Sequence, residues 1–129
     1  MKYEREVIIF VSKQNDSLMS RNKNFKLKKE EIKQLIKPMG GCIATDAITV
    51  ENLKVKYMTR MEPENDADSG WLFQSGTETQ EYMDDADNMA VYDVNTIANY
   101  DPSIIPYLES PIGSEFMRLV GTNQFKKLE

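Results

Sequence analysis

The chain has no histidine, and Cys42 is its only cysteine. These absences exclude an intrachain disulfide and a zinc site built from several cysteines or histidines. They also remove the base that usually activates a cysteine nucleophile, so Cys42 is interpreted as a small buried apolar residue. A chain with so little cysteine suits a reducing compartment, and we expect a cytoplasmic protein.

Long apolar runs are also missing. The best one, Val7–Val11, follows Glu4 and Glu6 and is far shorter than the ~20 residues that span a bilayer. It is too short even for the core of a signal peptide. We therefore expect neither membrane insertion nor export, and Val7–Val11 predicts a short buried strand instead.

Lysine and arginine are absent from residues 61–117, which contain thirteen of the chain's 21 acidic residues. Residues 1–60 carry thirteen basic and seven acidic side chains, so the net charge of -5 conceals a strong asymmetry. Such a charge distribution steers a cationic partner onto the acidic part, or two copies into a homodimer, and weakens with salt.

The acidic side chains gather in two turn-rich segments, 62–70 and 84–87. We predict that together they form one partner-binding face: Glu62, Glu64, Asp66, Asp68, Asp84, Asp85 and Asp87. No basic residue nearby in the sequence neutralises them. The alternative is that lysines from residues 27–37 fold back over the face and neutralise it internally, and both interpretations stay open.

Clustered carboxylates also raise the hypothesis of a metal-dependent enzyme. Asp66–Gly70 resembles part of a calcium loop, but Thr77 stands where the bidentate glutamate is required. Asp84, Asp85 and Asp87 lie in an Asp/Asn-rich turn that is typical of solvated surface. We therefore expect no catalytic residue, no metal and no cofactor, with the enzyme kept as an alternative function.

The hydrophobic pattern predicts one α+β domain over residues 1–129, with a mostly antiparallel sheet and short helical turns. An amphipathic helix is predicted over 27–37, with Ile32, Leu35 and Ile36 on its apolar face. Asp93 and Asp101 are predicted helix caps. Strands are predicted near 43–50, 53–61, 71–75, 89–92 and 115–120, the first two as a hairpin, with residues 121–129 as a tail. Core positions are predicted at Trp71, Phe73, Tyr92 and Ile97.

The predicted helix is rich in lysine, which gives a third hypothesis, an accessory protein that binds nucleic acid. Seven basic residues lie there or just before it: Arg21, Lys23, Lys26, Lys28, Lys29, Lys33 and Lys37. No aromatic or amide side chains suited to reading bases accompany them, and the net charge is negative. A solvated helix face is the favoured interpretation.

Several sequence words between residues 40 and 118 occur in an order that resembles a bacterial domain classed among the immunity proteins of polymorphic toxin systems. They are Gly40–Asp46, Met58–Pro63, Asp68–Trp71, Tyr82–Asp85 and Val91–Pro106. The resemblance implies a non-enzymatic protein that binds and neutralises a cognate toxin in the cytoplasm. It covers the acidic core of residues 40–120 and leaves residues 1–39 outside.

Overall fold

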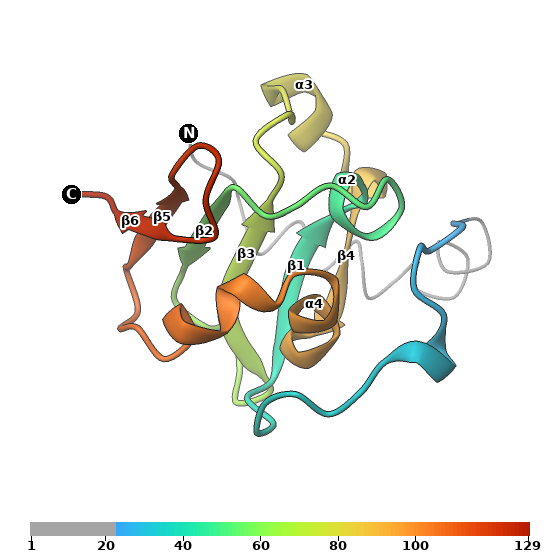
Figure 1. The fold of residues 1–129 in the computed structure, drawn as a ribbon, viewed down its shortest axis with the longest axis horizontal. Helices are drawn as coiled ribbons and strands as arrows, with labels where there is room; N and C mark the ends of the chain where they lie inside the picture. The colour runs from blue at the N-terminus through green and yellow to red at the C-terminus, as the bar shows by residue number, and fades with distance from the viewer. Residues whose placement is uncertain (1–22) are drawn as a thin grey trace.

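The computed structural model describes residues 23–129, and within this range it shows one six-stranded sheet with short helices (Figure 1). The α+β class predicted from the sequence is confirmed. The strands are β1 Gly41–Thr45, β2 Tyr57–Arg60, β3 Asp68–Gln74, β4 Met89–Asp93, β5 Glu115–Arg118 and β6 Phe125–Lys127. The α-helices are α2 Asp46–Thr49, α3 Gln80–Met83 and α4 Val94–Tyr100, and the 3₁₀ helices are η1 Lys29–Glu31, η2 Ala86–Asn88 and η3 Pro102–Tyr107.

The strand order is β4-β1-β3-β2-β5-β6, and each neighbouring pair is antiparallel except β1 with β3. The predicted hairpin of residues 43–50 with 53–61 is wrong, because β2 pairs with β3 and β5 instead. Strand β1 ends at Thr45, after which Ala47 and Ile48 are buried on α2. A short apolar run has the same appearance whether it enters a strand or a buried helical turn.

The main core lies between the sheet and a layer formed by α2, α4 and η3 (Figure 1). Trp71 and Phe73 alternate with Leu72 along β3, so both rings face this layer and stack at 5.9 Å between centroids. Both are fully buried, as is Ile97 on α4, and Tyr92 packs half-buried against the same cluster. Leu72 and Ile43 form a second cluster with Met83 and Met89.

Residues 23–39, here called the strap, are extended apart from the single turn η1. The predicted amphipathic helix over 27–37 is therefore wrong. Leu27, Ile36 and Met39 instead pack against the main core. Tertiary burial of these side chains outweighs the local helical period, because intrinsic propensity is a weak preference.

Two asparagines of α4 hold the extended backbone of the strap. Asn95 is 6% exposed, and its Oδ1 accepts hydrogen bonds from the N–H groups of Leu35 (2.8 Å) and Ile36 (3.2 Å). Its Nδ2 donates to the Lys33 carbonyl at 2.8 Å. Asn99, one helical turn later, bonds both the N–H (3.0 Å) and the carbonyl (2.8 Å) of Lys33. In a helix, these strap N–H and carbonyl groups would form hydrogen bonds with other backbone groups. Here the two asparagine side chains are their hydrogen-bond partners instead.

The predicted caps are confirmed, because Asp93 accepts from the Asn95 N–H and Asp101 from the Ser103 N–H. The predicted tail is wrong in part, since β6 closes the sheet beside β5. A buried ion pair between Asp101 and Arg118 connects η3 to β5. Arg118 Nε also donates to the Val55 carbonyl at 2.8 Å, so the pair ties three separate segments together.

The predicted strand Val7–Val11 lies outside the described residues. Over residues 23–129, no helix is long and apolar enough to cross a membrane.

Candidate functional site

The seven predicted partner-binding residues form two groups at opposite ends of the sheet. We call Glu62, Glu64, Asp66 and Asp68 the acidic loop, and Asp84, Asp85 and Asp87 the acidic corner. Strand β3 begins at the acidic loop and runs for seven residues toward α3, which precedes the acidic corner. At about 3.3 Å per residue, the groups lie roughly 20 Å apart along the strand. Figure 1 shows α3 above the sheet and the β2–β3 connection below it.

The backbone of the acidic loop is fixed by hydrogen bonds. The half-buried Asp68 accepts from the N–H groups of Glu64 (2.8 Å) and Gly70 (3.0 Å). Gly70 has a φ of 91°, and a Cβ there would lie 2.1 Å from the Met61 carbonyl oxygen, so this tight return requires glycine. The loop thus holds the exposed side chains of Glu62, Glu64 and Asp66 on an ordered scaffold.

Within the described part of the chain, the strap lysines form no ion pair with Glu62, Glu64, Asp66 or the acidic corner. Residues 23–129 contain two ion pairs, Lys23 with Asp46 and Arg118 with Asp101. Neither includes Glu62, Glu64, Asp66 or the acidic corner. Five lysines of the strap are exposed instead: Lys26, Lys28, Lys29, Lys33 and Lys37. The ion pairs that internal neutralisation by residues 27–37 would form with these exposed carboxylates are thus not observed among the described residues.

The acidic corner is also exposed, and its carboxylates organise the local turn. Asp85 accepts from the Asp87 N–H at 3.0 Å, and Asp84 accepts from the Gln80 side chain at 2.8 Å. Nearby, burial raises the pKa of Tyr82 to about 12, with further contributions from the negative charges of Asp46, Glu78 and Glu51. This end of the sheet therefore carries its own negative field.

Glu78 is a structural carboxylate that joins the ends of β1 and β3. Its Oε2 accepts from the Thr45 hydroxyl (2.5 Å) and from the Ser75 N–H (2.8 Å), and its Oε1 accepts from the Gly76 N–H (2.9 Å). Burial acts to raise its pKa, but these hydrogen bonds outweigh burial and leave the pKa lowered from 4.5. Both of its carboxylate oxygens accept hydrogen bonds that hold the ends of the two strands.

This pKa shift predicts part of the acid sensitivity of the fold. Because the folded pKa of Glu78 lies below its unfolded value, the stabilisation is present above pH 4.5 and is lost as pH falls through the folded pKa. The Glu78→Gln variant is therefore expected to lose stability at neutral pH and to show a shallower decline between neutral and acidic pH. Urea unfolding across this range measures both effects. An unchanged pH slope would contradict the assignment.

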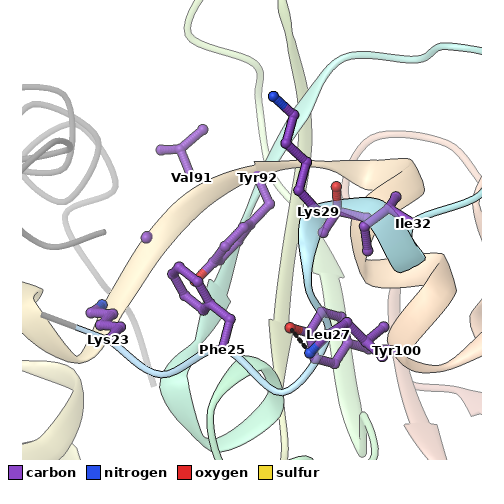
Figure 2. A pocket seen from close by; sticks show the side chains of 10 residues that line it. Lys23, Phe25, Leu27, Lys29, Ile32, Val91, Tyr92 and Tyr100 are labelled. Carbon is purple, nitrogen blue, oxygen red and sulfur yellow. Dashed lines mark hydrogen bonds between the residues drawn. The ribbon is translucent and has the colours of Figure 1, made fainter. Parts of the chain in front are cut away.

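A cavity of about 330 Å³ lies where the strap crosses β4 and α4 (Figure 2). The rings of Phe25 and Tyr92 meet edge to face at 5.9 Å. The Tyr100 hydroxyl accepts from the Leu27 N–H at 3.1 Å, and the Tyr92 hydroxyl pairs with that of Thr49. Burial raises the pKa of both tyrosines, so they stay protonated at neutral pH. The Tyr100 hydroxyl holds the strap at Leu27, whereas the Tyr92 hydroxyl connects β4 to α2.

A larger hollow of about 700 Å³, the strap groove, lies between the strap and the end of η3. Its apolar lining residues are Leu35, Ile36, Pro38, Met39, Ile105 and Leu108. Arg60 forms part of the lining and is itself anchored, because it donates to the carbonyls of Ser69 (2.9 Å) and Ser110 (2.8 Å). It also lies over the Trp71 ring at 5.8 Å. The groove therefore has fixed walls.

Sequence reasoning missed Asn95, Asn99 and Arg60. An asparagine pair four residues apart on an otherwise apolar helix was the available signal, since a buried amide needs hydrogen-bond partners. Across residues 23–129, no three cysteine, aspartate or glutamate side chains come close enough to hold a metal ion. The described carboxylates that have partners act as helix caps (Asp93), turn anchors (Asp68, Asp85), a link between strands (Glu78) or members of ion pairs (Asp46, Asp101).

The sequence of this chain matches one known protein family. The sequence model of the immunity protein Imm33 domain matches residues 42–129, which is more than half of the chain and confirms the resemblance. No curated protein and no solved structure matches the chain. Immunity proteins of toxin systems are generally non-enzymatic, and the family supports an immunity role in general. The chain belongs to the immunity protein Imm33 domain family.

Proposed function

We propose that this protein binds a cognate toxin and neutralises it without catalysis, and that the toxin contacts the acidic loop. Family membership supports the role, and the exposure of Glu62, Glu64 and Asp66 on an ordered loop supports the place. Within residues 23–129 these three carboxylates form no ion pair. Unneutralised charge of one sign accelerates the encounter with a cationic surface.

The acidic loop is preferred to the acidic corner because it adjoins an apolar hollow. Arg60, which lines the strap groove, stands two residues before the first residue of the loop, Glu62. Ala67, in the same loop, accepts a hydrogen bond from the Gly41 N–H at 2.7 Å, close to the end of the strap. Binding surfaces usually combine an apolar centre with a polar rim, and this end of the sheet offers both.

The test compares two variants that each lose three negative charges. Glu62→Gln/Glu64→Gln/Asp66→Asn removes them from the acidic loop, and Asp84→Asn/Asp85→Asn/Asp87→Asn removes them from the acidic corner while keeping its turn acceptors. The loop variant is expected to associate about tenfold more slowly with the cognate toxin, with a weaker salt dependence. The corner variant is expected to associate at nearly the wild-type rate.

Stopped-flow association at low and high salt measures the rates, and thermal unfolding checks that both variants stay folded. Equal slowing of the two variants would mean steering by net charge alone and would remove the acidic loop as the contact. If wild-type protein neither binds the toxin nor restores growth of cells expressing it, the proposed function itself is wrong.

A further inference from the structure

The strap groove has the form of a preorganised anchor site. Leu35 is 44% exposed at its edge, yet its backbone N–H is bound to the buried Asn95 at 2.8 Å. Holding an exposed leucine by a buried amide fixes an apolar side chain that a loose surface segment would leave mobile. Ile105 and Leu108, on the opposite wall, come from η3 and the residue that ends it.

The groove wall is connected rigidly to the rest of the fold. Arg60 joins it to the sheet through the carbonyls of Ser69 and Ser110. The Trp71 indole N–H donates to the Leu108 carbonyl at 3.0 Å, which fixes the end of η3 from beneath. A binding partner therefore meets a formed hollow and loses little free energy in ordering it.

The charges around the groove indicate the chemistry of the occupant. Glu109 lies on its rim, and the acidic loop begins two residues after Arg60. The lining cations are Arg60 and Lys37, and neither forms an ion pair among the described residues. The guanidinium of Arg60 is directed to the carbonyls of Ser69 and Ser110. Beyond the lining, the exposed carboxylates of Glu62, Glu64 and Asp66 in the adjoining acidic loop add to the negative charge of Glu109. An apolar side chain flanked by lysine or arginine complements this arrangement.

We propose that the strap groove receives an apolar side chain of the toxin, with basic residues beside it in the toxin meeting the acidic loop and Glu109. This inference rests on the proposed toxin binding and adds an anchor to it. The strap lies outside the matched family region, residues 42–129. A contact at Leu35 therefore gives this chain a determinant of partner choice that the matched domain does not contain.

The anchor and the acidic loop are expected to affect different rate constants. Desolvated apolar anchors slow dissociation, whereas exposed charges speed association. Leu35→Ser is thus expected to make this chain dissociate from its cognate toxin at least about tenfold faster. The association rate and its salt dependence are expected to stay unchanged. Leu53→Ser is the matched control, because Leu53 is similarly exposed, at 39%, and does not line the groove.

A crosslinking experiment tests the location independently. p-Benzoylphenylalanine is placed at position 35 or at position 53, and the full chain is irradiated with the toxin. Crosslinks to the toxin from position 35 alone are expected, on a toxin peptide that contains an apolar residue beside lysine or arginine. Crosslinks between two copies of this chain would overturn the proposal in favour of a homodimer contact.

The two proposals fail in different ways. Tight toxin binding with a wild-type dissociation rate for Leu35→Ser would overturn the anchor and leave the proposed function standing. Equal effects of Leu35→Ser and Leu53→Ser would also overturn it. Absence of toxin binding by the wild-type chain would overturn both.

Discussion

Replacing Asp101 by alanine is expected to lower the free energy of unfolding by about 3–5 kcal/mol. Asp101 is 2% exposed, and its Oδ2 accepts from the Val55 N–H at 2.9 Å and from Arg118. Its Oδ1 accepts from the Ser103 N–H and hydroxyl. The variant leaves a largely buried guanidinium without its counter-charge, and that penalty exceeds the loss of the bonds themselves. Urea unfolding measures the difference.

Two companion variants identify the cause of this loss. Asp101→Asn keeps the size of the side chain and removes the charge, so a smaller loss is expected. Asp101→Ala/Arg118→Met removes both partners and is expected to be less destabilised than the sum of the single variants, because no orphaned charge remains. If Asp101→Ala costs less than ~1 kcal/mol, the ion pair is not the clamp between η3 and β5 that the geometry indicates.

Replacing Asn95 by alanine is expected to release the strap and to lower the free energy of unfolding by about 2–3 kcal/mol. Three hydrogen bonds are lost, to Leu35, Ile36 and Lys33. Because the strap lies at the surface, its backbone groups are expected to turn to water, which limits the loss. Native-state hydrogen exchange is expected to show much faster exchange at the Leu35 and Ile36 amides.

Asn99→Ala is the control for this prediction. Asn99 is half-buried, and Lys33 is the strap residue to which it bonds. Asn99→Ala is therefore expected to lower the free energy of unfolding by about 1 kcal/mol. The Leu35 and Ile36 amides are expected to stay protected from hydrogen exchange. Equal protection of these two amides in Asn95→Ala and wild-type protein would show that apolar packing of Ile36 and Met39 holds the strap without the asparagine.

Local signals predicted a good part of the fold. The alternation around Trp71 and Phe73 indicated a strand, and Asp93 and Asp101 indicated helix starts, because each signal depends on neighbours within a few residues. The parallel pairing of β1 with β3 and the extended strap depend on contacts between distant residues. The period of Ile32, Leu35 and Ile36 fitted a helix equally well. Contacts with distant residues decide against it: the bonds to Asn95 and Asn99, some sixty residues later, and packing against the main core.

The sequence predicted which residues make up the candidate site, but not where the fold places them. The acidic residues and their exposure follow from a stretch without lysine or arginine. Their separation does not, because β3 places residues before and after it at opposite ends of the sheet. The strap groove had no sequence signal, since its walls come from three segments that the fold brings together: residues 35–39, Arg60 and residues 105–109.

The central position of β1 also has a consequence for synthesis. Its two neighbours, β3 and β4, both follow it in the sequence, so β1 leaves the ribosome with neither edge paired. Between Thr45 and Met89, elongation at about 5–20 residues per second takes roughly 2–9 s. During that delay, an apolar segment with Cys42, Ile43 and Ala44 stays open to chaperones or to other nascent chains.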